Sequence, residues 1–245
     1  MRYALYFTPP ASHRLTQLAS RWLGRDAFSD RAFEPAAAGG FAADEIARHT
    51  ESPRRYGFHG TLKAPFALAD PEDHPEFLAA LMNFCSARDR FPMPRLSVSR
   101  LGPFFALTPA EPSDALQAMA DDVVREFDHF RAPLSEADIA RRSPERLSET
   151  ERAHLKRWGY PYVFDAFRFH MTLTGPVPET DAARMERLLE DHFAPVLAEP
   201  LDFDSLALFI EPKRGEPFVV DSLHPLGKIE HRRERPAVKT AAGTQ

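Results

Sequence analysis

An eight-residue segment occurs twice in this chain. Residues 58–65 read FHGTLKAP and residues 169–176 read FHMTLTGP, so both copies fit the pattern F-H-x-T-L-x-x-P. Each copy is followed by a segment with helical periodicity, a strand-like run, a turn and a second strand-like run. This repeat predicts two similar α+β units, related by a pseudo-two-fold axis.

The elements predicted around the repeat are short. Strands are expected at 96–101, 104–108, 201–211 and 217–222, and the strand of the second copy is expected to start near Val163. Helices are expected at 12–23, 42–49, 71–87, 113–130 and 181–197, where apolar residues recur at helical spacing. We therefore predict an α+β fold in which antiparallel sheets line a central groove and the helices lie outside.

The domain organisation follows from the repeat. We expect one bilobal domain over residues 1–230, with lobes at about 50–132 and 160–228 that carry one His-x-Thr motif each, and an added N-terminal strand at 2–8. Residues 134–158 are charged and have helix caps at Ser135 and Ser148, which indicates an inserted pair of short helices. This insertion either covers a cleft or is a solvated hairpin. Residues 231–245 are polar and are predicted to be a disordered tail.

Composition excludes several classes of protein. The net charge of -5 argues against bulk binding of nucleic acid. Cys85 is the single cysteine, which excludes a disulfide framework and a cysteine-based metal site. No window approaches the length of a membrane-spanning helix, and the N-terminal residues lack the features of a signal peptide. We expect a cytoplasmic monomer with no membrane partner.

Strand geometry gives the repeated motif two different faces. Alternate residues of a strand point to the same side, so His59, Thr61 and Lys63 are expected to share one face. The second copy places His170 and Thr172 on the equivalent face. A single histidine in a strand is more often structural than functional. Two copies in equivalent units favour a functional role for these histidines. A zinc site is a poor alternative, because the two histidines have no nearby carboxylate or cysteine to complete the set of ligands.

Two facing imidazoles are suited to acid–base chemistry. An unperturbed pKa near 6.5 allows one histidine to accept a proton while the other donates one. The hydroxyls of Thr61 and Thr172 can donate to phosphate oxygens, and Lys63 can add positive charge on the same face. The pattern predicts phosphoryl chemistry that requires no metal or other cofactor.

Paired His-x-Thr motifs on strands of a duplicated α+β fold resemble the 2H phosphoesterase superfamily, which includes 2′-5′ RNA ligase-like proteins and cyclic nucleotide phosphodiesterases. The chain is also similar to one branch of this superfamily, the DUF1045 group, whose members are described as phosphonate metabolism proteins. The segments that carry this similarity are RYALYF at 2–7, WLGRD at 22–26, PRRYGFH at 53–59 and FHMTLTG at 169–175. The resemblance covers residues 2 to about 225. It implies metal-independent hydrolysis of a 2′,3′- or related cyclic phosphodiester, with catalytic roles for His59, Thr61, His170 and Thr172.

Other residues are candidates for substrate binding. Tyr3 and Tyr6 fall on opposite faces of the first strand, and we favour Tyr6 as the one that lines the groove. Arg55 and Tyr56 lie just before the first motif, where they could contact a phosphate or base.

Arg168 shares the His170 face and is a further candidate for binding an anion. The expected partner is a small phosphodiester or nucleotide. RNA end-processing or 2′-5′ ligation is the alternative activity, less favoured because the chain is acidic. A non-catalytic binder of phosphorylated metabolites is the third possibility.

Overall fold

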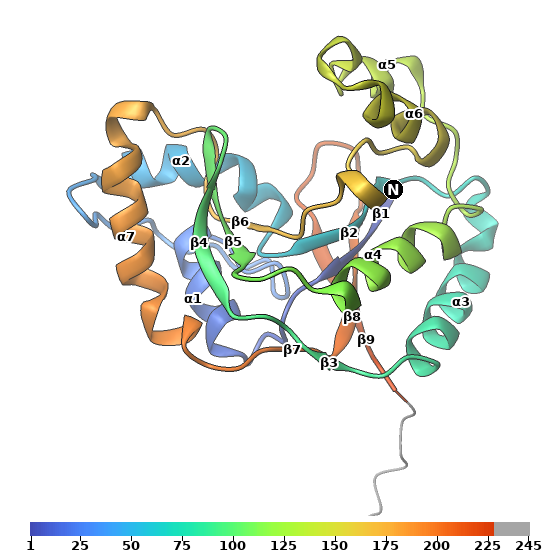
Figure 1. The fold of residues 1–245 in the computed structure, drawn as a ribbon, viewed down its shortest axis with the longest axis horizontal. Coiled ribbons are helices and arrows are strands. Elements are labelled where there is room, and N and C mark those ends of the chain that lie inside the picture. Colours follow the sequence, from blue (N-terminus) through green and yellow to red (C-terminus); the bar gives the residue numbers. More distant parts are fainter. Residues whose placement is uncertain (228–245) are drawn as a thin grey trace, which may run out of the picture.

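The computed structural model describes residues 1–227 (Figure 1). The predicted disordered tail at 231–245 lies outside these residues. A seven-stranded sheet, antiparallel at every pairing, forms the centre of the fold in the order β4-β5-β6-β2-β1-β8-β9. Its strands are β1 (Arg2–Phe7), β2 (Gly60–Phe66), β4 (Leu96–Leu101), β5 (Phe104–Pro109), β6 (Met171–Thr172), β8 (Ser205–Glu211) and β9 (Val219–Pro225). The predicted α+β class with antiparallel strands is confirmed.

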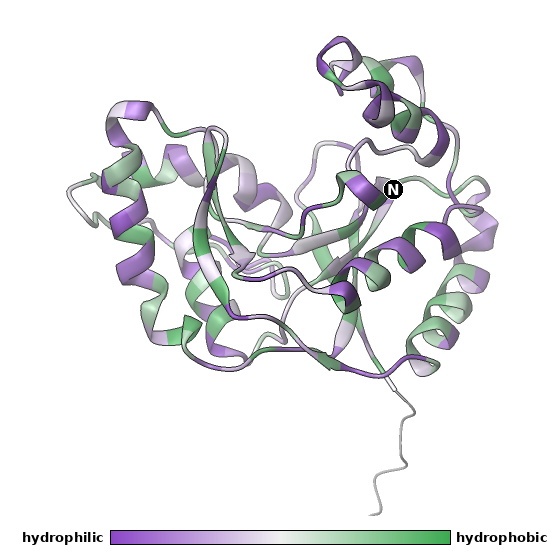
Figure 2. Cartoon of the chain, in the orientation of Figure 1, coloured by the Kyte–Doolittle hydropathy of each residue, from purple (hydrophilic) through white to green (hydrophobic). Residues whose placement is uncertain are grey.

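Five longer helices pack against this sheet. They are α1 (Arg14–Leu23), α2 (Ala43–Tyr56), α3 (His74–Ser86), α4 (Asp114–Glu126) and α7 (Glu179–Leu197). Each contributes apolar side chains to one large core cluster, together with residues from the sheet. Helices α3, α4 and α7 show hydrophobic and hydrophilic stripes, as expected for helices with one packed and one solvated side (Figure 2). No helix within residues 1–227 has the length and apolarity needed to cross a bilayer.

The order of elements repeats along the chain. The first copy runs β2, α3, β3 (Phe91–Pro92), β4 and β5, and the second runs β6, α7, β7 (Asp202–Phe203), β8 and β9. The short strands β3 and β7 pair with each other. Each long hairpin, however, lies beside the motif strand of the other copy. The β4–β5 hairpin of the first copy pairs with β6, and the β8–β9 hairpin of the second copy pairs with β1, which is the neighbour of β2. The two halves therefore share one sheet, and the two motif strands are direct neighbours at its centre.

The two faces of the sheet are distinguished by the first strand. Tyr3, Leu5 and Phe7 belong to the large core cluster beneath the helices. Ala4 and Tyr6 point to the other side, where they form a smaller cluster with residues of β8 and the loop before β9. The face without the large helical core is therefore the one available for a site.

Two local predictions need correction. The strand expected to start near Val163 begins only at Met171, because residues 164–166 form a 3-10 turn and Phe164 has a left-handed backbone with φ 55°. The helix expected at 42–49 continues to Tyr56, through Pro53. Proline removes one backbone donor, and that loss is compensated elsewhere, as described below.

The insertion contains two helices, α5 (Glu136–Ala140) and α6 (Glu149–Trp158), separated by a 3-10 turn at Pro144–Arg146. The Ser148 hydroxyl accepts from the backbone of Glu151, whose carboxylate accepts from the Ser148 N–H. This reciprocal cap explains why α6 begins there. Figure 1 shows both helices above the N-terminus of the chain, where β1 begins.

Candidate active site

The two His-x-Thr motifs meet at the centre of the sheet. The middle residues of the motifs pair with each other across β2 and β6. Continuing this register by one residue places His59 opposite Thr172, and in the other direction it places Thr61 opposite His170. Diagonal neighbours in an antiparallel pair lie roughly 7–8 Å apart, so both histidines can reach the same small group. The pairing makes the four side chains symmetric about the pseudo-two-fold axis.

The middle residues of the motifs differ for a packing reason. Met171 is buried in the main core. Gly60 has no side chain because the ring of Phe169 occupies the space: a Cβ built on Gly60 would lie 2.5 Å from two of its ring carbons. Phe169 directly precedes His170, so glycine at position 60 allows the second motif to lie close to the first.

Both imidazoles are held by the same kind of backbone contact. The Nδ1 atom of His59 lies 2.9 Å from the carbonyl oxygen of Gly57. The Nδ1 atom of His170 lies 2.8 Å from the carbonyl oxygen of Arg168. A carbonyl oxygen can only accept, so Nδ1 carries the proton in both rings and donates it. In each neutral ring, Nε2 is therefore the atom that can accept a proton.

The surroundings disfavour a positive charge on either ring. Burial lowers the pKa of His59 from 6.5 to about 4, against the opposing effect of the Gly57 carbonyl, and nearby His170 lowers it further. Burial also lowers the pKa of His170, against the opposing effect of the Arg168 carbonyl. Both rings are consequently neutral near pH 7, and a bound anion would raise both pKa values.

Aromatic rings account for much of this burial. The Tyr6 ring stacks on the His59 imidazole, with centroids 3.9 Å apart and planes 20° apart. Tyr6 in turn packs against Phe209, at 4.9 Å between centroids. Phe104 lies 5.9 Å from the ring of His170. Tyr6 does share the His59 face, but it is only 1% exposed, so it supports the imidazole instead of offering a surface to a ligand.

The two motif threonines retain their hydrogen-bonding capacity. Thr61 and Thr172 are half-buried, and neither hydroxyl is engaged by another group within residues 1–227. Thr174 behaves differently, because its Oγ1 accepts a hydrogen bond from the backbone of Phe105 at 2.9 Å and its side chain is buried. The hydroxyls of the two motifs are therefore the ones that can serve a ligand beside the histidines.

The prediction that Lys63 shares the face of His59 is wrong. Tyr6 of β1 is opposite Thr61, but its neighbour Leu5 is opposite Lys63, so β2 contains one extra residue at this point. Such a bulge shifts the alternation by one position and turns Lys63 toward the helices. Its Nζ lies 3.2 Å from a carboxylate oxygen of Asp128 and 3.4 Å from the carbonyl oxygen of Val124.

Burial lowers the pKa of Lys63 to about 8, although Asp128 opposes this shift. Lys63 is 3% exposed and already paired with a carboxylate. It is therefore part of the structural framework beneath the site and does not contact a ligand at the histidines.

The predicted arginines are also arranged differently from the expectation. Arg55 forms an ion pair with the buried carboxylate of Glu211, which also binds Arg2 at 2.5 Å. Arg168 is exposed, and it is its backbone carbonyl that contacts His170. Tyr56 packs on Phe218 with nearly parallel rings.

The ring centroid of Tyr56 lies 6.2 Å from that of His59. Arg55 is thus held by a carboxylate, and Arg168 orients a catalytic candidate through its main chain.

A proline inside α2 helps to position the second motif. Pro53 cannot donate a hydrogen bond to the carbonyl of His49, the residue four positions earlier. That carbonyl instead accepts from the backbone of Gly175, at 2.6 Å. The end of the second motif segment is thereby fixed to α2, while the indole of Trp22 donates to the carbonyl of Leu173 at 2.9 Å.

Two residues that the sequence did not single out come from the insertion and from the segment directly after it. The guanidinium of Arg142 lies over the ring of Tyr160, 4.9 Å from its centroid. Burial raises the pKa of Tyr6 well above its usual value of 10, Tyr56 and Tyr160 raise it further, and Arg2 and Arg142 oppose the rise. Arg142 is half-buried and forms no ion pair with a carboxylate in the part of the chain that the structure describes. The sequence indicated only that residues 134–158 are charged and form an inserted pair of helices, and it gave no reason to select Arg142.

Within residues 1–227, no group of three or more His, Cys, Asp or Glu side chains has the arrangement of a metal site.

A family model described as "Protein of unknown function (DUF1045)" matches residues 61–219. The chain belongs to the DUF1045 family. Two curated relatives are both named ribose 1,5-bisphosphate phosphokinase PhnN. The protein from Janthinobacterium sp. (strain Marseille) is 38% identical over 222 residues, which cover 89% of this chain and 49% of the relative. The protein from Laribacter hongkongensis (strain HLHK9) is 37% identical, with 89% and 50% covered.

The DUF1045 chain thus spans about half the length of the curated relatives it matches. Among solved structures it is similar to one described as a phosphoesterase, with a TM-score of 0.42 and 14% identity over 93% of this chain and 99% of the other. E. coli LigT complexed with NADP+ has the same TM-score and identity, over 93% and 98%. Likeness at this level carries no argument about activity.

Proposed function

We propose that this DUF1045 protein is a phosphoesterase of the 2H type, which hydrolyses a cyclic phosphodiester without a metal ion. The observation that carries the proposal is the symmetric pairing of the two His-x-Thr motifs on one sheet face. Two imidazoles with the same tautomer and two unengaged hydroxyls then converge on one location. Acid, base and phosphate-binding groups are what this reaction requires.

The proposed reaction is an attack of water on the phosphorus atom of the ring. We assign His59 as the base because its pKa of about 4 leaves Nε2 unprotonated near neutral pH and therefore available to accept a proton. Nε2 takes a proton from the water as the new P–O bond forms. His170 enters as imidazolium, whose pKa the anionic substrate raises, and its Nε2 proton goes to the leaving oxygen as the ring P–O bond breaks. The product is a phosphate monoester, and a proton exchange with solvent restores both rings.

The threonines stabilise the charge that develops during this reaction. The hydroxyls of Thr61 and Thr172 lie beside the opposite motif's histidine, as the strand register requires. In that position they donate to the non-bridging phosphate oxygens. Each side of the phosphate then receives the histidine of one strand and the threonine of the other.

The substrate we favour is a phosphorylated ribose with a cyclic diester. Two observations support this class over a long RNA. The curated relatives carry a name that refers to ribose 1,5-bisphosphate. The net charge of -5 also disfavours a polyanion. Arg142, which lies over the ring of Tyr160 and forms no ion pair within residues 1–227, is our candidate for contacting a second phosphate or a base on the substrate.

The test is turnover by the purified chain in EDTA, with a panel of 2′,3′-cyclic nucleotides and ribose cyclic phosphates. His59→Gln and His170→Gln should each lower kcat by roughly 10²- to 10⁴-fold, the usual contribution of a general acid or base. His129→Gln is the matched control, because His129 is exposed and remote in sequence from both motifs. Undiminished turnover in either site variant would refute the assignment.

The same panel separates the alternatives. Joining of RNA ends by the chain would favour ligase-like chemistry at the same histidines. Binding of phosphorylated metabolites that survives both histidine substitutions, without turnover, would favour a non-catalytic binder. Loss of turnover in EDTA would contradict the metal-independent mechanism.

A further inference from the structure

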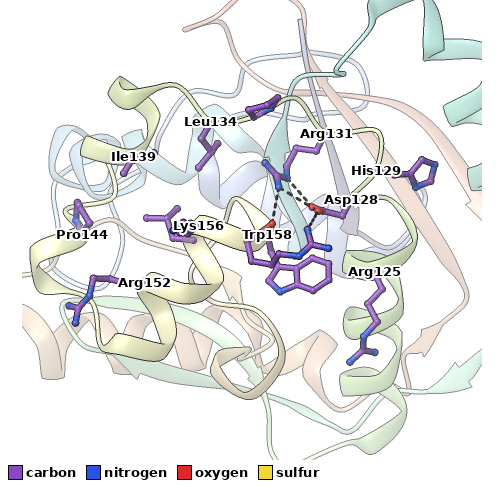
Figure 3. Close-up of a pocket in the computed structure, with 13 residues that line it drawn as sticks. Arg125, Asp128, His129, Arg131, Leu134, Ile139, Pro144, Arg152, Lys156 and Trp158 are labelled. Carbon is purple, nitrogen blue, oxygen red and sulfur yellow. Dashed lines mark hydrogen bonds and ion pairs between the residues drawn. The ribbon is translucent and has the colours of Figure 1, made fainter.

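The insertion forms a large cavity that does not include either catalytic candidate. A space of about 850 Å³ lies between the C-terminal end of α4 and the helices α5 and α6. Its walls come from residues 125–134, from α5 and from the second half of α6. Figure 3 shows the residues that line this space, with Arg131, Asp128 and Trp158 gathered at its centre. The volume is within the range of sites that bind small organic ligands.

The charge of the cavity wall is strongly positive. Asp128 is the one carboxylate among the residues that line it, and its side chain is 9% exposed. Three cations contact this carboxylate: Lys63 at 3.2 Å, Arg131 at 2.9 Å and Arg157 at 3.1 Å. Asp128 and its three cationic partners together have a net charge of +2. Figure 3 shows Asp128 between Arg131 and a second guanidinium, beside the indole of Trp158.

Further cations surround this cluster without being neutralised within it. Lys156 and Arg152 are exposed residues of α6 that line the cavity, and no carboxylate within residues 1–227 pairs with either. Arg152 donates one hydrogen bond, to the carbonyl of Leu147. An anion in the cavity would therefore meet uncompensated positive charge from two directions.

The wall also has an apolar part. Leu134, Ile139 and Leu155 line it together with two prolines, and the half-buried indole of Trp158 forms one side. Ile139 is 38% exposed, so part of its side chain is available to a ligand. An indole beside an arginine cluster is suited to a planar ring that carries an anionic group.

We propose that this cavity is a second ligand site, which binds a phosphate monoester attached to a planar apolar group, such as a nucleoside monophosphate. The phosphate contacts the cations of α6 and the cluster around Asp128, and the planar group packs against Trp158 and the aliphatic side chains. Lys63 joins the wall of this site to β2, the strand that follows His59. The proposal stands on the cavity and its charges and is independent of the chemistry proposed for the histidines.

The test uses the full chain and adenosine 5′-monophosphate as the probe, with adenosine and inorganic phosphate as comparison ligands. Binding is followed by calorimetry and by tryptophan fluorescence, since Trp158 and the buried Trp22 are the two tryptophans of the chain. The nucleotide should bind at least about tenfold more tightly than either comparison ligand, because each lacks one half of the interaction. The double variant Lys156→Glu with Arg152→Glu should weaken binding by about tenfold or more.

Two controls locate the site. Arg146→Glu makes the same kind of charge change at an exposed residue of the same insertion that does not line the cavity, and it should leave the affinity within about twofold. His59→Gln should also leave it unchanged. Absence of nucleotide binding, equal binding by the α6 double variant, or binding lost only in His59→Gln would overturn the proposal. Inorganic phosphate that binds as tightly as the nucleotide would refute the proposed ligand class.

Discussion

The buried environment of His59 should make the protein less stable in mild acid. Its pKa is lowered to about 4, mainly by burial, whereas an unfolded histidine titrates near 6.5. The unfolded chain therefore takes up the proton first as the pH falls. The stability present above pH 6.5 is lost progressively as the pH falls toward 4, and no more is lost below that point.

The size of this loss follows from the two pKa values. Between pH 7.5 and pH 4.5, a shift from 6.5 to about 4 corresponds to a decrease of about 2.5 kcal/mol in the free energy of unfolding. His59→Gln removes the titrating group and keeps a polar side chain of similar length beside Tyr6. The variant should therefore lose about 2.5 kcal/mol less than the wild type over this pH range.

Urea unfolding at the two pH values measures this difference. Other groups also titrate over the range, so the relevant quantity is the change in the wild type minus the change in the variant. His129→Gln, at an exposed position, is the control and should behave like the wild type. Equal acid sensitivity in the wild type and His59→Gln would refute the reasoning, as would an NMR titration of His59 with an ordinary midpoint.

Further predictions concern the framework and the substrate. Gly60→Ala should destabilise the fold by about 1–3 kcal/mol and reduce turnover, because Phe169 has to move; unfolding and kinetic assays check this. Lys63→Met should cost about 3 kcal/mol by removing a buried partner of Asp128, with KM unchanged; a raised KM at full stability would restore Lys63 to the active site. Arg142→Ala should raise KM about tenfold with little change in kcat, and an equal loss in kcat would contradict a binding role. The profile of kcat/KM against pH should have its maximum below 6.5, since the pKa values of both site histidines are lowered; an optimum above neutrality would contradict this.

Much of the architecture could be predicted from local patterns. The motif segments place Phe58, Leu62 and Met171 in the core, as alternation along a strand requires. The hairpin at β4–β5 and the capped helices of the insertion also follow from turn and cap residues close to one another in the sequence. Such features depend on neighbours a few residues away, which is the information a single sequence contains.

The errors have a common origin in long-range packing. The strand of the second motif is expected to start near Val163, but the chain turns there and β6 is only two residues long. The bulge in β2 depends on how β1 pairs with it, and this bulge decides the side on which Lys63 emerges. A shift of one residue reverses a side chain's face, and the sequence of β2 alone does not contain that shift.

The sequence alone determined that two matched histidines and two matched threonines belong together, because a duplicated word in equivalent units is visible without coordinates. It also determined the antiparallel α+β class. Only the tertiary structure decided that the two motif strands are adjacent, that the hairpins exchange sides, and that the insertion encloses a cationic cavity together with the end of α4. Strand order and cavity shape arise from contacts between residues far apart in the chain, and their energies depend on the whole packed core rather than on any local pattern.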